Sequence, residues 1–334
     1  MGLCNGKRVS CIPFDVKIFA DLYTCLTDMI YLKYVDPHHF HPSGIGINLI
    51  TEMKDSECIE FLQWALPKMR MRWPGFRKVR RQVCRRIKRR LSELELSGSS
   101  DYRRYLVTRP EEWPELDSMC RITISRFYRD RGLFEHLENE ELQEIAGKAT
   151  ARGDREFRCW SIGSASGEEA YTLVLIWELR LKSRFPSLEL RIIATDSDPN
   201  MIRRGAAGCY RPESMKDLPE ELMKAGFDRS GEQLCIKDRF KKQVKFLNQD
   251  IREIMPDGPF QIILCRNLVF TYFDEGLQRE ILERLAERLI PGGLLVTGTH
   301  ETLPDGVDDL FLRVAPHMGI YRRRFQSQVI EDKH

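Results

Sequence analysis

The chain has 334 residues, of which 42% are hydrophobic and 31% are charged. This composition supports a sizeable buried core, and the length corresponds to about two domains of ordinary size. The sequence contains no apolar run near the ~20 residues that a membrane helix needs, and acidic residues interrupt its first apolar stretch, so we expect neither a transmembrane helix nor a secretory signal. The net charge of +3 gives no general argument for nucleic acid as a partner.

The ten cysteines are scattered singly along the chain, without a CxxC pair. This spacing predicts reduced thiols and a cytoplasmic protein. His38, His39 and His41 lie close together, but no cysteine or carboxylate accompanies them at the spacing of metal ligands. We therefore expect a polar loop at these histidines and no metal site.

Residues 1–42 form an N-terminal extension that the sequence leaves unassigned. Residues 43–135 show helix caps and breaks without the alternation typical of strands, which predicts an all-α N-terminal domain. Within it, the window 68–90 holds twelve Lys or Arg residues and no Asp or Glu. Apolar residues at spacings of three and four predict an amphipathic helix over 76–96. Its basic face carries Arg77, Lys78, Arg81, Arg85, Lys88 and Arg89. That face is either a solvated surface or a docking surface for an acidic protein.

Strands and helices alternate from about residue 136, which predicts a Rossmann-like parallel sheet with helices on both faces. Strands are expected over 157–162, 188–195, 260–265 and 294–298. Helices are expected over 168–183, from 199 onward and over 277–289, with a turn at 291–293. Two short strand candidates, 234–236 and 243–247, predict a small antiparallel insertion at about 209–247.

A ligand site is expected at the carboxyl ends of these strands, where doubly wound sheets bind their ligands. Gly163 and Gly167 bound the loop after the first strand, and Asp196 ends the second, where its carboxylate can accept hydrogen bonds from both ribose hydroxyls. The loop is not GxGxxG, and Glu168 and Glu169 at the helix start would repel a pyrophosphate. S-adenosylmethionine, with its ammonium, sulfonium and ribose, suits both ends of this site. Alternatively, the two glutamates only complement the helix dipole.

The same residues resemble the bacterial chemotaxis receptor methyltransferases, the CheR family. The stretch 160–172, WSIGSASGEEAYT, resembles the family motif WSAGCSTGEEPYS. Four further stretches follow in the family's order: Ser125–Asp130 (T-x-F-F-R-D), Ala194–Asp196 (A-S/T-D), Cys265–Asn267 with Tyr272–Phe273 (C-R-N-x-x-x-Y-F), and Gly298–Glu301 (G-H-S-E). The resemblance extends over about residues 43–323.

The resemblance implies a Rossmann-like class I methyltransferase that moves the methyl group of S-adenosylmethionine onto a protein glutamate, leaving S-adenosylhomocysteine. It implies two catalytic residues, Arg129 and Tyr272, of which Arg129 orients the acceptor carboxylate. Glu168 would hold the methionine ammonium and Asp196 the ribose. The full set of cofactor-binding residues is Ser125, Gly163, Gly167, Glu168, Asp196, Asp250, Ile251, Arg266 and Asn267. Within it, Asp250 and Ile251 would flank the adenine, and Arg266 and Asn267 would line the floor near the methionine.

This chain departs from the family pattern at several positions. Asp250 stands where the family has Asn, Thr123 stands where Asn is usual, and Ser125 replaces a Thr. Thr271 stands where the family has its Tyr, and Tyr272 comes one residue later. Either Tyr272 does the work of the family's tyrosine, or that hydroxyl has been replaced.

Three functions are compatible with these features. The first is an enzyme that methylates an acidic, chemoreceptor-like protein through the basic helix; a carboxylate acceptor needs no general base because it is already ionised near neutral pH. The second is a methyltransferase for RNA or a small molecule, although few aromatic residues near the basic helix are free to stack on bases, which disfavours nucleic acid. The third is a scaffold that binds S-adenosylmethionine without turnover.

Overall fold

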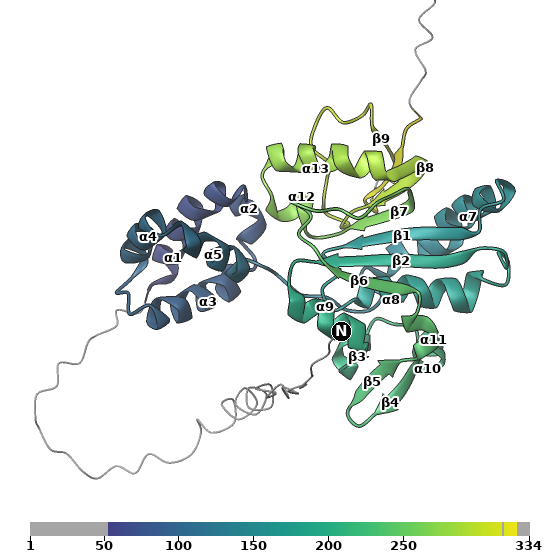
Figure 1. The fold of residues 1–334 in the computed structure, drawn as a ribbon, viewed down its shortest axis with the longest axis horizontal. Coiled ribbons are helices and arrows are strands. Elements are labelled where there is room, and N and C mark those ends of the chain that lie inside the picture. The colour runs from purple at the N-terminus through teal and green to yellow at the C-terminus, as the bar shows by residue number, and fades with distance from the viewer. Residues whose placement is uncertain (1–52, 316, 326–334) are drawn as a thin grey trace, which may run out of the picture. The chain divides into compact units, whose positions relative to one another are not determined.

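A computed structural model describes residues 53–315 and 317–325 of the chain (Figure 1). The described helices and strands group into one compact unit. The whole predicted extension, residues 1–42, with its three neighbouring histidines, lies outside the described residues, so the expectations for it are untested. No described helix is long and apolar enough to cross a membrane.

The chain from Asp55 to Met119 forms a helical segment. Its helices are α1 (Asp55–Ala65), α2 (Trp73–Phe76), α3 (Arg80–Glu93), α4 (Ser99–Thr108) and α5 (Trp113–Met119). The predicted apolar stripe is buried at Phe76, Val83, Ile87 and Leu91. The predicted single helix over 76–96 is nevertheless divided, because residues 77–79 form a turn between α2 and α3. Two further helices, α6 (Arg131–His136) and α7 (Leu142–Ala151), lead into the sheet.

The central sheet has seven strands. They are β1 (Glu156–Ile162), β2 (Glu189–Asp196), β6 (Val244–Asn248), β7 (Phe260–Cys265), β8 (Leu289–Val296), β9 (Phe311–Ala315) and β10 (Ile320–Arg323). Their order is β6-β2-β1-β7-β8-β10-β9; the first five run parallel, and β10 is antiparallel to both of its neighbours. This arrangement confirms the α/β, Rossmann-like fold and the four expected strands.

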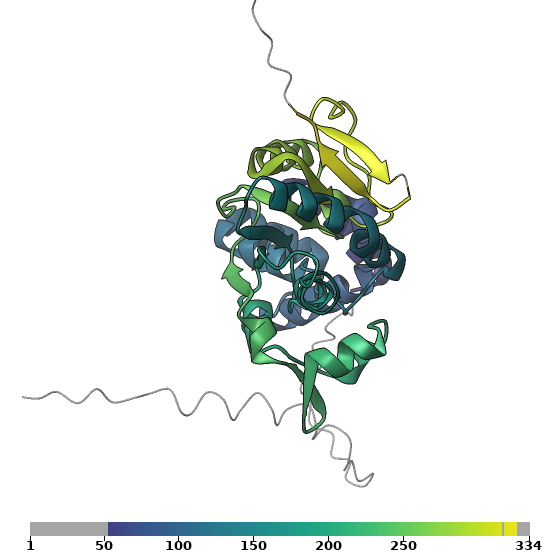
Figure 2. The same ribbon diagram turned by 90° about the vertical axis from the view of Figure 1, so that its right-hand side faces the viewer.

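Both faces of the sheet are buried, as expected for parallel strands between helices. Alternate residues of β1 belong to different hydrophobic clusters: Phe157 and Cys159 to one, and Trp160 and Ile162 to the other. The first cluster includes residues of α7 and of α8 (Glu168–Ile176), and the second includes α13 (Glu275–Arg288) and the helical segment. Helices thus cover both faces (Figures 1 and 2). Helix α9 (Pro199–Ala207) follows β2.

The expected insertion is smaller than the sequence indicates. Its sheet consists of β3 (Cys209–Tyr210), β4 (Phe227–Ser230) and β5 (Gln233–Ile236), in the antiparallel order β3-β5-β4. The assignment of 243–247 to this insertion is wrong. Residues 244–248 form β6, which pairs in parallel with β2 from Ile192 to Asp196 at the edge of the central sheet.

The turn expected at 291–293 is also absent as such, because β8 continues through these residues. Its register with β7 shifts from Phe260 opposite Leu289 to Ile262 opposite Leu294, so the extra residues form an irregularity inside the strand. Gly293 fits there because a Cβ atom would stand 3.0 Å from the carbonyl oxygen of Gln261. Strands β9 and β10 were not predicted.

Four cysteines are disulfide-bonded, so the prediction of reduced thiols is wrong for them. Cys58 of α1 is bonded to Cys84 of α3, and Cys209 is bonded to Cys235 across the neighbouring strands β3 and β5. Each pair lies 26 residues apart in sequence. Sequence spacing therefore did not indicate these pairs. They form because α1 packs on α3 and β3 pairs with β5.

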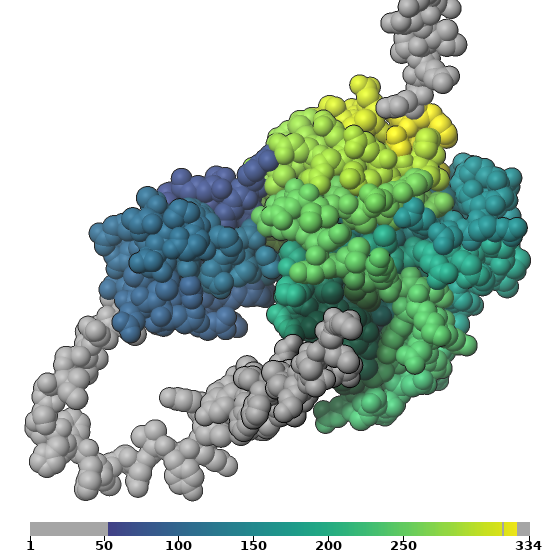
Figure 3. Space-filling view, viewed as in Figure 1, coloured from purple at the N-terminus to yellow at the C-terminus, as the bar shows by residue number. Residues whose placement is uncertain are grey.

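The helical segment contacts the sheet through the end of the short helix α12 (Val269–Tyr272). Met71 forms a β-bridge with Phe273, and the Arg72 amide donates to the Tyr272 carbonyl at 2.8 Å. The surface of α2 meets the region of α12 and α13 in Figure 3. Gly75 lies at this contact, where a Cβ atom would stand 2.2 Å from the Thr271 carbonyl oxygen.

We therefore expect Gly75→Ala to lower the free energy of unfolding by about 1–3 kcal/mol, the usual cost of an added methyl group in a filled contact. Urea unfolding measures this change. Gly147→Ala is the matched control, since Gly147 lies in α7 with open space around it. The control should gain up to about 1 kcal/mol from helix propensity. Equal behaviour of the two variants would show that the contact at α12 is not tight.

Candidate functional site

Two adjoining cavities lie at the carboxyl ends of β1, β2 and β7. The larger cavity is bordered by Gly163, Asp196, Asp250, Ile251, Asn267 and Tyr272, and by residues of the helical segment that include Phe76 and Asp117. The smaller cavity is bordered by Ser125, Arg129, Gly163, Glu169, Arg266 and Asn267. Both include Ile122, Gly163 and Asn267, so they meet at the end of β1.

The loop between β1 and α8 requires its two glycines for different reasons. Gly163 has a φ of 61° and Gly167 a φ of 85°, and both values favour glycine. A Cβ atom at Gly167 would also stand 2.6 Å from the ring of Phe246 on β6. The loop is thus shaped by backbone conformation and by its packing against the neighbouring strand. Gly167 itself borders neither cavity.

Asp196 presents a fixed carboxylate to the larger cavity. One oxygen accepts from the amide of Ala165 and the other from the amide of Asp198, both at 2.9 Å. Burial raises the pKa of Asp196, and these amide hydrogen bonds oppose the rise. Each oxygen keeps a lone pair for a further donor. The carboxylate can therefore accept from two neighbouring hydroxyls, as a ribose requires.

Glu168 is only 3% exposed, yet its carboxylate is incompletely paired. Oε1 accepts from the Ser166 hydroxyl at 2.8 Å, whereas Oε2 is buried without a hydrogen bond. Burial raises the pKa of Glu168; the Ser125 hydroxyl lies close enough to lower it, without bonding to Oε2. The neighbouring Ser164 hydroxyl is also buried and unpaired. An ammonium group near these atoms would satisfy both.

Glu169, and not Glu168, borders the smaller cavity, where it is paired with Arg266. Glu169 accepts from the Ser161 hydroxyl at 2.9 Å and from Arg266 at 2.8 Å. The Arg266 side chain is 4% exposed and also binds Asp130 and, at 3.3 Å, the carbonyl of Arg129. Arg266 thus joins the ends of β7 and α8 to the residues that precede α6.

Arg129 has a different environment from Arg266. Its guanidinium donates to the carbonyl of Ile124 at 3.3 Å, and within residues 53–315 and 317–325 it has no carboxylate partner. Its own carbonyl is held by Arg266, which fixes the backbone from which the side chain extends. Arg129 therefore borders the cavity with most of its N–H donors available, and such a guanidinium is suited to bind a carboxylate through two parallel hydrogen bonds.

Tyr272 reaches the larger cavity, whereas Thr271 is engaged elsewhere. The Thr271 hydroxyl donates to Glu301, a buried carboxylate that also accepts from the amides of Asn267 at 2.8 Å and Gly298 at 2.6 Å. The Tyr272 ring packs against Phe76 at 4.9 Å between centroids. Burial raises the pKa of Tyr272, and the charge of Arg129 opposes the rise. Tyr272 therefore borders the cavity, whereas the Thr271 hydroxyl is held by Glu301.

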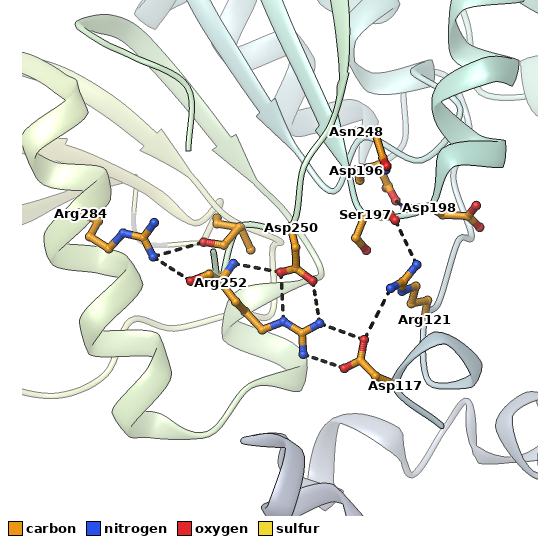
Figure 4. A network of polar contacts seen from close by, with 10 residues as sticks. Asp117, Arg121, Asp196, Ser197, Asp198, Asn248, Asp250, Arg252 and Arg284 are labelled. Atoms are coloured by element: carbon orange, nitrogen blue, oxygen red, sulfur yellow. Dashed lines mark hydrogen bonds and ion pairs between the residues drawn. The ribbon is translucent and has the colours of Figure 1, made fainter. Parts of the chain in front are cut away.

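Asp250 lies on the wall of the larger cavity within a network of ion pairs (Figure 4). Both of its oxygens accept from Arg252, which also binds Asp117 at the end of α5. Burial acts to raise the pKa of Asp250, but the hydrogen bonds and charge of Arg252 outweigh it and lower the pKa. Asp250 therefore stays ionised and can accept a hydrogen bond from an amino group, such as that of adenine.

The donor and acceptor groups fit S-adenosylmethionine. Asp196, Asp250 and the unpaired oxygen of Glu168 are acceptors of the kind that a ribose, an amino group and an ammonium need, and their individual roles stay predictions. Of the predicted residues, only Gly167 and Glu168 border neither cavity. Sequence reasoning missed Glu301 and Arg252. Glu301 stood in a quoted motif without a role, whereas no signal in the sequence joined Arg252 to Asp117, 135 positions away.

Comparisons with known proteins agree with the resemblance. The family model "CheR methyltransferase, SAM binding domain" matches residues 123–318, more than half of the chain. A probable chemotaxis protein methyltransferase of Rhizobium etli is 28% identical over 253 residues, covering 74% of this chain and 91% of that protein. A chemotaxis protein methyltransferase of Vibrio anguillarum is 30% identical over 245 residues, covering 71% and 86%. The solved structure of the N-methyltransferase NodS from Bradyrhizobium japonicum is 14% identical, with a TM-score of 0.32 and coverage of 58% and 97%.

The state of Glu168 leads to a prediction that separates stability from binding. Because burial raises its pKa, ionised Glu168 costs folding free energy above that pKa in the protein without ligand. Glu168→Gln removes this charge, so we expect an unchanged or higher melting temperature at neutral pH. Affinity for S-adenosylhomocysteine should fall about tenfold or more, the loss of one charge-assisted hydrogen bond. Thermal unfolding and calorimetry measure the two. Lower stability with unchanged affinity would make Glu168 purely structural.

Proposed function

Because the chain belongs to the CheR methyltransferase family, we propose that it methylates a glutamate side chain of an acidic, chemoreceptor-like protein. Membership makes it an S-adenosylmethionine-dependent methyltransferase. The observation that supports a carboxylate acceptor is Arg129, a guanidinium on the wall of the smaller cavity without a carboxylate partner among the described residues. Arg266, in the same wall, already has its two carboxylates.

The residues of the site would act mainly by positioning. Bound S-adenosylmethionine supplies an electrophilic methyl group. Arg129 would hold the acceptor carboxylate by its fork of donors, with one oxygen directed at the methyl group, and Tyr272 would border the same space from the larger cavity. Holding two reactants in line lowers the barrier without proton transfer. Since a glutamate is already ionised near neutral pH, the site needs no general base.

The assignment of the cofactor-binding residues belongs to this proposal. Asp196 would bind the ribose, Glu168 the ammonium, and Asp250 with Ile251 the adenine. Asn267 would line the floor, held by Glu301 through its backbone amide. Ser125, Gly163, Gly167 and Arg266 would shape the methionine end. We likewise propose residues 43–135 as the helical domain and 136–334 as the cofactor-binding domain.

The basic face of α3 supports an acidic partner. Arg86 and Arg90 are used inside the helical segment: Arg86 donates to the carbonyls of Met119 and Arg121, and Arg90 binds Glu112. By contrast, five residues of the predicted basic face are exposed: Arg77, Lys78, Arg81, Arg85 and Arg89. Among the described residues, the side chains of Arg81 and Arg85 make no ion pair, so they are available to acidic groups of a partner.

The chemistry of the product tests the proposal. With methyl-labelled S-adenosylmethionine and the acceptor proteins of a bacterial lysate, we expect the label on protein and its release as methanol in mild base, because glutamate esters hydrolyse whereas methylated amines and nucleobases do not. Arg129→Ala should lower turnover while S-adenosylhomocysteine affinity stays within about twofold, as for a group that acts on the acceptor.

Tyr272→Phe should lower turnover less than Arg129→Ala. Tyr105→Phe is its matched control, because Tyr105 lies in α4 and borders neither cavity. A base-stable label, or label in RNA, would contradict the carboxylate acceptor. Binding of the cofactor without any label on protein or RNA would instead favour a scaffold.

The basic face can be tested by charge reversal. Arg81→Glu with Arg85→Glu should raise KM for the acidic protein about threefold or more at low salt, and less at high salt where charges are screened. Cofactor affinity should not change. Arg155→Glu with Lys242→Glu is the matched control, because these exposed residues make no ion pair among the described residues and precede β1 and β6 at the opposite end of the sheet. An equal rise of KM in the control would leave only a general effect of net charge.

A further inference from the structure

One arginine joins the helical segment to the wall of the larger cavity. Arg252 follows β6 and binds both oxygens of Asp117, at 2.6 and 2.9 Å. The same guanidinium binds both oxygens of Asp250, at 3.0 and 2.6 Å (Figure 4). We call Asp117, Arg252 and Asp250 the Arg252 bridge. All three border the larger cavity.

The Arg252 bridge is partly buried. The side chains of Asp117, Asp250 and Arg252 are 11%, 18% and 26% exposed. Salt and water screen the charges of such a group less than those of a surface ion pair. Removing one member leaves the charge of its partner uncompensated. The bridge therefore holds its members more firmly than exposed pairs of the same geometry.

The loop that carries Asp250 is also held from its other side. Arg284 of α13 donates to the carbonyls of Ile251, Arg252 and Glu253, at 3.4, 3.1 and 3.2 Å. The backbone amide of Arg252 donates to Asp250 at 2.9 Å. With the backbone fixed by Arg284, the direction of the Asp250 carboxylate depends on Arg252.

The end of α5 is attached at both sides of the larger cavity. On one side, Asp117 binds Arg252. On the other, Arg121 donates to the carbonyl of Ser197 at 3.0 Å, next to Asp196, and lies 3.7 Å from Asp117. The connection from α5 to α6 begins here and carries Ser125 and Arg129 to the smaller cavity. The adenine side and the acceptor side are thus joined through the end of α5.

We propose that Arg252 is a positioning residue with two roles. It directs Asp250 toward the adenine amino group, and through Asp117 it fixes the start of the α5–α6 connection, which carries Arg129, relative to the cofactor. The proposal rests on the proposed placement of adenine at Asp250. Because Asp117 holds Arg252 and Arg252 holds Asp250, a substitution of Asp117, on the helical segment, should alter cofactor affinity and base selectivity.

The experiment compares Asp117→Asn with the matched control Glu280→Gln. Arg70 binds Glu280 of α13 with two hydrogen bonds of 2.8 Å and thus makes another ion pair of the helical segment. Both residues are exposed, however, and neither borders the larger cavity. Calorimetry measures the affinity of each full-length variant for S-adenosylhomocysteine and for its inosine analogue, in which a carbonyl oxygen replaces the adenine amino group.

We expect the wild type to prefer the adenine compound by about tenfold or more, the value of one hydrogen bond to a charged group. Asp117→Asn should weaken adenine binding about fivefold or more, the lower end of typical coupling, and reduce the preference. Asp117→Glu, which keeps a carboxylate for Arg252, should restore most of both. Glu280→Gln should change neither.

Unchanged affinity and preference in Asp117→Asn would overturn the proposal. So would an equal loss in Glu280→Gln, or a loss of affinity with the preference intact, since a merely structural role lowers both affinities together. These measurements need no methyl transfer. A base-stable product would therefore refute the proposed acceptor and leave the Arg252 bridge to be judged by the binding data alone.

Discussion

Arg266 is a buried positive charge at the carboxyl end of a central strand, and such a charge is stable only with partners. Asp130 and Glu169 supply them from the start of α6 and the start of α8. Removing a partner from a buried pair is costly, so the three segments are held in one arrangement. The smaller cavity lies among these segments, since Arg129, Glu169 and Arg266 all border it. The pairing of Arg266 thus determines where the backbone of Arg129 and the loop after β1 can lie.

Charges around the cavities divide into paired and unpaired groups. Arg266 and Arg252 each bind two carboxylates, and Glu301 accepts three hydrogen bonds. Glu168 has an unpaired buried oxygen, and the Arg129 side chain donates, among the described residues, only to the carbonyl of Ile124. The paired charged side chains stabilise the walls of the cavities, whereas the unpaired ones can still bind groups of a ligand. This division supports an ammonium at Glu168 and a carboxylate at Arg129.

The differences between sequence and structure have physical causes. The strand at 244–248 is short and half-buried, and its pattern does not say whether its partner is the insertion or β2. The sequence Pro291-Gly292-Gly293 is typical of a turn, but it occupies an irregularity of β8 because the register with β7 absorbs the extra residues. The cysteine pairs depend on contacts between α1 and α3 and between β3 and β5.

The sequence by itself determined the fold class and three of the strands at whose carboxyl ends the cavities lie, β1, β2 and β7. Local patterns suffice for these, because burial on both faces requires apolar strands and tight loops require glycine at positive φ. Only the tertiary structure decided that Tyr272 faces the larger cavity while Thr271 binds Glu301. It also decided that Arg252 joins Asp117 to Asp250. Ion-pair partners that are far apart in the chain meet only after packing, because the local sequence around a charged residue does not indicate which residue will neutralise it.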